Sequence, residues 1–223
     1  MPSNFPSLTP LRGANINKGM LGGMGATFND GSYMSEKGGD IKGTPLLFEN
    51  WNIGSVWMHS KEHFDSLLLK YDEMNDLLFV KIDGNEYQFN PEVDAFTIRD
   101  SATKKLLLFR NGFAPVSTFS NSTFYQVLFD GRVKLLLKNK KQVVSSITST
   151  PGVREKSFED QISYFLMLSS GELRKIKKKN TTIIDWLDDP NGQLSAMVKT
   201  NKLKMNTEEE IIQVLRYYDT LKK

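Results

Sequence analysis

The chain has 223 residues, of which 39% are hydrophobic, and a formal net charge of +3. That length suits one large β domain or two small ones, and the net charge is too small to indicate a class of partner. Cysteine is absent, which excludes disulfides, thiolate nucleophiles and cysteine metal ligands. No stretch is long and apolar enough to span a bilayer as a helix.

The N-terminal segment is rich in glycine and proline. Residues 1–44 hold nine of the sixteen glycines and show neither helical nor strand periodicity. The run GMLGGMG at 19–25 resembles a phosphate-binding loop, but no Lys-Ser/Thr pair follows it. We therefore predict a flexible segment over 1–43 and no nucleotide site. The chain also lacks a basic region followed by an apolar run, so no secretory signal peptide is recognised.

The next segment predicts a series of strands. Apolar and aromatic residues indicate strands at 45–51 and 54–60, and residues 63–89 alternate as a three-stranded meander. Its second turn contains Asp83-Gly84, a pair that accepts positive φ at both central positions of a type I′ turn.

Further strands are predicted at 95–99 and 104–110. Asp130-Gly131 predicts a hairpin joining 124–129 to 132–138, and a turn ending at Gly171 predicts another joining 162–168 to 172–177. The polar stretch 142–156 contains Pro151-Gly152 and is predicted to be a long loop.

Beyond residue 180 the apolar spacing becomes helical. Short helices are predicted from Thr182 and over 194–200, and Thr207 with Glu210 forms a capping box for a longer, amphipathic helix. The predicted fold is mainly β, an antiparallel curved sheet or sandwich-like meander with a small C-terminal helical cap (α+β). Its predicted parts are a flexible segment 1–43, a β domain 44–179 and a helical cap 180–223 packed on the sheet.

The residues that could carry catalysis are few. His59 and His63 are the only histidines, and no G-x-S-x-G nucleophile motif accompanies them. Carboxylates cluster at 72–76 and 92–94, where exposed turns account for them. We therefore predict no catalytic residue, no metal site and no cofactor.

Two sets of residues are candidates for binding. The aromatic residues of the predicted strands could line a ligand site on a curved sheet, although core packing accounts for most of them: Trp51, Trp57, Tyr71, Tyr87 and Phe89. The basic run near residue 175 could bind anions, or could protect an exposed sheet edge from aggregation: Arg174, Lys175, Lys177, Lys178 and Lys179.

The charges are distributed unevenly along the chain. Residues 49–100 carry four Lys/Arg against eleven Asp/Glu, whereas 131–179 carry twelve against four. These two segments are expected to attract each other or to present opposite potentials to a partner.

The segment from Gly43 to Phe96 resembles the start of a family of uncharacterised, exported β-rich envelope proteins of Gram-negative bacteria. The resemblance lies in a GTPLLFENW opening followed by Gly54, in the meander with Tyr71, and in a C-terminal tyrosine pair at 217–218. It implies export to the periplasm or envelope, and it supplies no catalytic residues. A cytoplasmic location is the alternative.

Together these observations predict a non-catalytic cell-envelope or interaction protein, not an enzyme. Its partner is expected to be another protein or an envelope component, with no nucleic acid and no membrane-spanning segment. The first alternative is a protein that holds an apolar or glycan ligand on a curved sheet. The second is an undiagnosed hydrolase, which would require two acids or a histidine to converge in a pocket.

Overall fold

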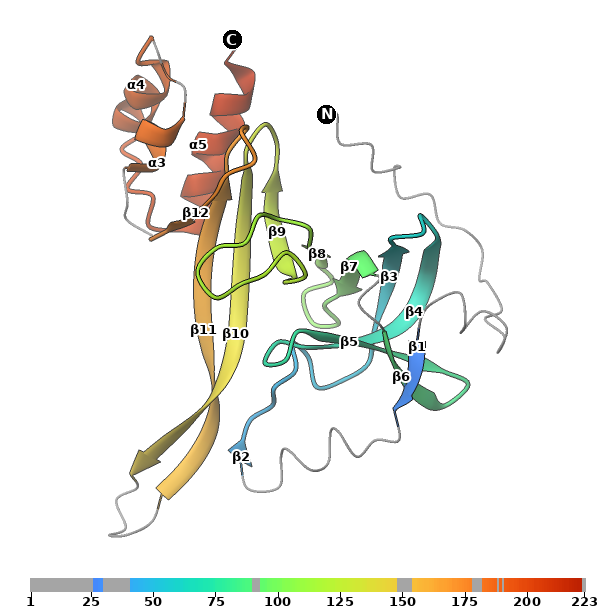
Figure 1. Ribbon diagram of the computed structural model, residues 1–223. Helices are drawn as coiled ribbons and strands as arrows, with labels where there is room; N and C mark the ends of the chain where they lie inside the picture. Colours follow the sequence, from blue (N-terminus) through green and yellow to red (C-terminus); the bar gives the residue numbers. More distant parts are fainter. Residues whose placement is uncertain are drawn as a thin grey trace. The chain divides into compact units, whose positions relative to one another are not determined.

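A computed structural model describes residues 41–89, 93–147, 154–177, 182–187, 189 and 191–221, together with the backbone of 26–29. The chain divides into two compact units, one formed by residues 1–40 and 46–106 and the other by residues 41–45 and 107–223. The predicted fold class is confirmed: the chain is mainly β, and its helices lie near the C-terminus (Figure 1). The predicted domain limits stay a prediction.

The first unit contains an antiparallel sheet with the strand order β1-β6-β5-β4-β3-β7. Its strands are β1 (Ala26–Asn29), β3 (Asn52–Met58), β4 (His63–Asp72), β5 (Leu77–Ile82), β6 (Asn85–Phe89) and β7 (Val93–Arg99). The predicted meander is present as β4, β5 and β6. Asp83 and Gly84 have φ of 50° and 83°, the two positive values that a type I′ turn requires.

The core of this unit follows the strand alternation. Leu67, Leu69 and Tyr71 of β4 point to one face and are at most 2% exposed, and Val56 and Phe96 pack there from β3 and β7. Each such side chain contributes about 1.5–3 kcal/mol when fully buried.

Glycine is required where β3 passes β7. A Cβ at Gly54 would lie 1.9 Å from the carbonyl oxygen of Thr97 and 2.7 Å from Leu69 Cδ1. The close approach of the two strands therefore leaves no room for a side chain at this position.

Three expectations for the first unit are wrong. The stretch 45–51 is not a strand and contains only one isolated bridge, from Leu46 to Asp72. The carboxylates of Asp72 and Glu73 are buried and not exposed, because the turn gives Asp72 backbone donors: the Met74 and Asn75 N–H groups lie 2.8 and 3.0 Å from its Oδ1. Within 1–43, β1 pairs with β6, although no strand was expected there; the remainder of that segment up to residue 40, with its glycine run, lies outside the described residues.

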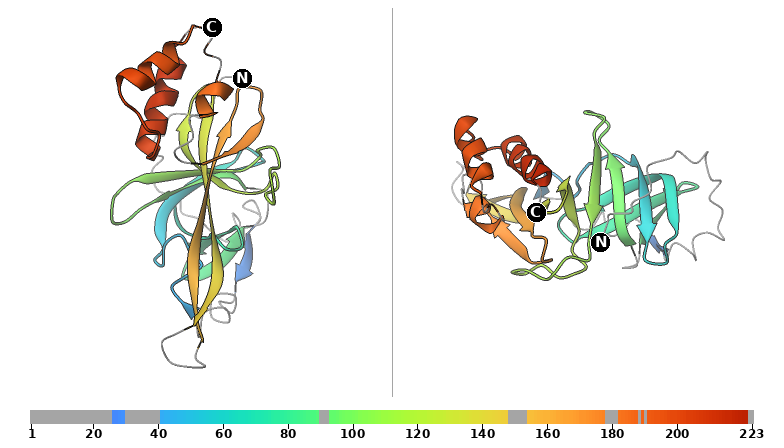
Figure 2. Two further views of the ribbon diagram at one scale, coloured as in Figure 1. Left: turned by 90° about the vertical axis from the view of Figure 1, so that its left-hand side faces the viewer. Right: turned by 90° about the horizontal axis from the view of Figure 1, so that it is seen from above.

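The second unit contains the strand order β8-β9-β10-β11-β12, with β2 added parallel to β11. The strands are β2 (Ile41–Lys42), β8 (Leu106–Arg110), β9 (Tyr125–Asp130), β10 (Lys134–Ile147), β11 (Arg154–Met167) and β12 (Leu173–Ile176). The prediction of a loop over 142–156 is wrong for 142–147 and 154–156, because β10 and β11 pair without a break from Lys134↔Met167 to Ile147↔Arg154. They continue as the long two-stranded ribbon seen in Figure 2. Residues 148–153, with Pro151-Gly152, lie outside the described residues.

Each face of this sheet has its own hydrophobic core. On one face, Leu135 and Leu166 pack with buried residues of the helices α3 (Thr182–Trp186), α4 (Gln193–Thr200) and α5 (Glu208–Thr220). On the other face, Tyr125 and Phe165 pack with Phe113 and Phe119 from the segment between β8 and β9. The helices thus cover one face, and the β8–β9 connection covers the other.

Candidate functional site

A pocket of about 530 Å³ lies in the second unit, beside Tyr164 and Ile176, where the pairing of β11 with β12 ends. Three segments line it: residues 117–119 between β8 and β9, residues 161–164 of β11, and residues 175–177 at the end of β12. The lining contains two lysines, hydroxyl and amide groups, and no carboxylate or histidine. Its polar groups therefore favour an anionic ligand.

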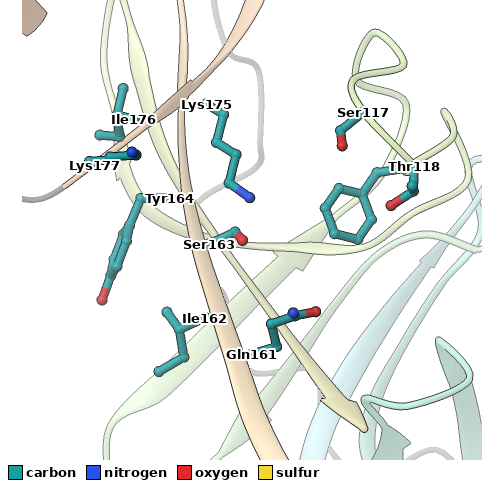
Figure 3. Close-up of a pocket in the computed structure, with 10 residues that line it drawn as sticks. Ser117, Thr118, Gln161, Ile162, Ser163, Tyr164, Lys175, Ile176 and Lys177 are labelled. Atoms are coloured by element: carbon teal, nitrogen blue, oxygen red, sulfur yellow. The ribbon is translucent and has the colours of Figure 1, made fainter.

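Strand register determines which side chains enter this pocket. Phe165 pairs with Lys175 and Tyr164 with Ile176, so Lys175 shares the face of Phe165 and of Ser163, two residues earlier. In Figure 3, Lys175 and the Ser163 hydroxyl lie on the side of β11 that faces residues 117–119, whereas the Tyr164 ring lies on the other side. The Tyr164 hydroxyl donates to Glu208 Oε1 at 2.6 Å, which joins β11 to α5.

The loop wall of the pocket is held by a tight turn and by an aromatic anchor. Val116 and Phe119 exchange two backbone hydrogen bonds of 3.1 and 3.0 Å, and Ser117 takes a positive φ of 55°. The Phe119 ring packs edge-on against Tyr125 and Phe165, with centroid distances of 6.0 and 5.8 Å. Residues 117–119 therefore have a fixed position relative to β11.

The five basic residues predicted to bind anions separate into three groups. Lys175 and Lys177 line the pocket, are exposed, and have no ion-pair partner in the described part of the chain. Arg174 points to the opposite face, where its Nε and Nη2 donate to Glu172 at 2.7 Å each, and this hydrogen bonding raises the pKa of Arg174. Lys178 and Lys179 lie outside the described residues.

The five aromatic residues predicted to line a ligand site do not share one face. Trp57 lies on the outer face of β3 and Trp51 directly precedes that strand; both are half-buried, and Lys70 Nζ lies 5.0 Å from the centroid of the Trp51 ring. Tyr71, Tyr87 and Phe89 lie on the inner face of the meander, and Tyr71 is 1% exposed. The structure thus brings together two of these residues on one face and three on the other.

The two histidines are also separated. His59 Nδ1 lies 3.3 Å from Asp94 Oδ1 at an exposed site. His63 Nε2 lies 3.0 Å from Asp65 Oδ1, and that same oxygen accepts a hydrogen bond of 2.6 Å from the Ser55 hydroxyl. In a catalytic triad the imidazole stands between serine and aspartate. Here the aspartate stands between the other two, so His63 is not placed to take the serine proton.

Sequence reasoning identified Lys175 and Lys177 but missed the rest of the pocket. Aligning the predicted 162–168 and 172–177 hairpin about Ser170, the central residue of its Ser169-Ser170-Gly171 turn, would have placed Ser163 opposite Lys177, so a signal for that residue was available. Residues 117–119 lie outside every predicted strand, and no signal in the sequence connects them with β11.

The fold and the pocket define this chain as a mainly β protein of two compact units, the second of which has a lysine-lined pocket. No family model, curated protein or solved structure matches the chain. Within the described residues, no three potential metal ligands gather, and none of the helices has the length and apolar character needed to cross a membrane.

Proposed function

We propose that this chain is a non-catalytic interaction protein that binds an extended, acidic segment of a partner protein in the pocket between β11, β12 and residues 117–119. The single observation that carries the proposal is the pair Lys175 and Lys177, which line the pocket with no carboxylate beside them. The location in the cell envelope, which the family resemblance implies, belongs to the same proposal.

The spacing of the two lysines supports an extended ligand. Lys175 lies in β12 and Lys177 directly follows Ile176, the last residue of that strand, so their Cα atoms are at most about 7 Å apart. Alternate carboxylates of an extended peptide have the same spacing, so two ion pairs can form together. Binding at a strand edge would add main-chain hydrogen bonds to these ion pairs.

The edge of β11 beside the pocket supports the same mode of binding. β12 pairs with β11 at 164–167 and β2 pairs with it at 156–157, so 158–163 has no strand on that side in the described part of the chain. The part of this stretch that lines the pocket, 161–163, carries no charge and is the part that an acidic peptide would pair with. The surrounding charge also favours an acidic partner, because residues 131–179 carry twelve Lys/Arg against four Asp/Glu.

The test is a titration of the full chain against a fluorescein-labelled peptide of four Glu-Val repeats, followed by fluorescence anisotropy. The variant K175Q/K177Q is expected to bind about tenfold or more weakly, because both ion pairs are lost. The matched control is K199Q/K202Q, which removes the same charge from exposed lysines of the α4 region and is expected to bind normally.

Three outcomes would contradict the proposal. These are no binding at low salt, equal loss in both double variants, and equal binding of a Gln-Val peptide. Duplex DNA and anionic vesicles serve as competitors, and stronger binding of either at the same lysines would replace the acidic peptide as ligand.

The outer face of β3 and β4 favours a second candidate, an apolar or glycan ligand held on the sheet of the first unit. Ile53 and Leu68 pair directly across these strands, and their exposed fractions are 56% and 40%. Trp51 and Trp57 flank Ile53 on the same face. A ligand bound there would change tryptophan fluorescence, and I53D would abolish that change while K175Q/K177Q would not.

A further inference from the structure

The outer half of β10 has an open strand edge. β9 pairs with β10 only over 134–137, whereas β11 accompanies β10 along all 14 residues. From Lys140 to Ile147, β10 therefore has β11 as its one neighbouring strand within the described chain. A two-stranded ribbon is only marginally stable in water on its own.

The last six residues of this edge lack the features that normally protect an exposed strand. Residues 142–147 read QVVSSI, with no charge, proline or glycine. Natural edges use lysine, proline or a bulge to prevent pairing with another chain, and here the β10–β11 register is unbroken. Val143 and Ile147 are 38% and 79% exposed on this segment.

We propose that a second copy of this chain pairs with residues 143–147 of β10, antiparallel, about a two-fold axis at Ser145. The two ribbons then form a four-stranded sheet, with the strand order β11-β10-β10-β11. Because a two-fold contact uses the same edge of both copies, the assembly closes as a dimer.

The two-fold axis determines the register. Two residues that lie directly opposite each other in an antiparallel pair have their side chains on the same face of the sheet. The two-fold axis must therefore lie midway between the two copies of one residue, so that this residue pairs with its own copy. An axis at Ser145 puts Val143 of one copy opposite Ile147 of the other, and it does so twice. These cross-strand apolar pairs shield the exposed side chains of the segment.

The charges favour β10 over β11 as the self-pairing edge. About Ser145, the uncharged residues 143–147 face only one another across the axis. The open stretch 158–163 of β11 carries Glu159 and Asp160 near its centre, so a second copy there would bring carboxylates together. β2 also pairs with β11 at 156–157, which shortens that edge.

Single cysteine variants test this register, because the chain has no cysteine of its own. In S145C the two thiols meet at the axis, where a Cα separation of about 4.5–5.5 Å permits a disulfide. Mild oxidation should convert most of the protein to a covalent dimer on a non-reducing gel. In the control E159C, the thiols lie three strand spacings apart across the sheet and six residues apart along it, about 25 Å in all, and should remain uncrosslinked.

A charge variant separates pairing from folding. S145E places its carboxylate opposite Lys156 within the ribbon, which preserves the hairpin, but it places two carboxylates face to face across the axis. Its dimer dissociation constant in sedimentation equilibrium should rise about tenfold or more, while S145T stays dimeric. A wild-type chain that is monomeric at all concentrations, or crosslinking of E159C in place of S145C, would overturn the proposal.

Discussion

At the scale of single residues, Tyr71 shows how a buried polar group is satisfied. Its ring is fully buried against Phe96, with a centroid distance of 5.1 Å, and its hydroxyl donates to Asp76 Oδ1. Burial, reinforced by the nearby Asp76 carboxylate, raises the pKa of Tyr71 well above its usual value. The hydroxyl therefore stays protonated in the folded protein at a pH where it ionises in the unfolded chain.

This shift predicts a loss of stability at alkaline pH. Below the unfolded pKa of about 10, Y71F should lower the free energy of unfolding by about 1–2 kcal/mol, because the hydrogen bond to Asp76 is lost. Above that pH the unfolded wild-type chain releases a proton that the folded one retains, so wild-type stability falls and the two proteins converge. Urea unfolding between pH 7 and 11 measures both, and a constant difference throughout would contradict the assignment.

Short-range residue chemistry was the predictable part at this scale. Asp83-Gly84 takes the expected positive φ values because the pair itself permits them. The donors that satisfy the Asp72 carboxylate are local, but the segment that bridges to its backbone comes from Leu46, 26 positions away in the sequence, and local patterns do not report such a contact. Residues 117–119 were missing from the predicted site for the same reason, because their neighbours in β11 are far away in the sequence.

At the scale of elements, α5 is specified by its own sequence. The Thr207 side chain accepts a hydrogen bond of 3.2 Å from the Glu210 N–H, and Glu210 Oε2 accepts one of 2.7 Å from the Asn206 N–H. The predicted capping box is therefore confirmed, with the reciprocal bond shifted by one residue. Ile211, Leu215 and Tyr218 are buried at the predicted helical spacing.

Removing this cap should weaken the second unit. T207A is expected to lower the free energy of unfolding by about 1 kcal/mol, because the Glu210 N–H loses its acceptor, and T207S should recover most of it. The control is T200A on exposed Thr200 of α4, which should be neutral or slightly stabilising, since alanine has the higher helix propensity. Equal effects of T207A and T200A in urea unfolding would contradict the capping role.

The ribbon of β10 and β11 shows why other elements escaped prediction. Amphipathic alternation marks a strand only where one face is buried and the other is not. Beyond Lys141 neither face of the ribbon is covered by the cores that flank β9 and β12, so the segment has the composition of a loop. These two strands are specified by their continuous pairing with each other. The pattern of residues within one strand does not show which segment it pairs with.

At the scale of the whole molecule, both the charged residues and the hydrophobic cores are unevenly distributed. The acidic segment 49–100 lies in the first unit and the basic segment 131–179 in the second, so the two units differ in the sign of their charge. Within the second unit, β10 passes from a part with a core on each face to a ribbon with none. Local stability should follow that change along the strand.

The protection of backbone amides from hydrogen exchange should therefore decrease along β10, and in its outer half it should depend on protein concentration. Amides of 134–137, paired on both sides, should be the most protected at any concentration, and those of 140–147 the least protected in dilute solution. If a second copy pairs at the β10 edge, protection at 143–147 should rise with concentration, and rise more than at 154–161 of β11, because only β10 gains a new strand. S145E should abolish that rise without affecting 134–137. An equal rise in both strands would indicate that the whole ribbon is ordered by something other than edge pairing.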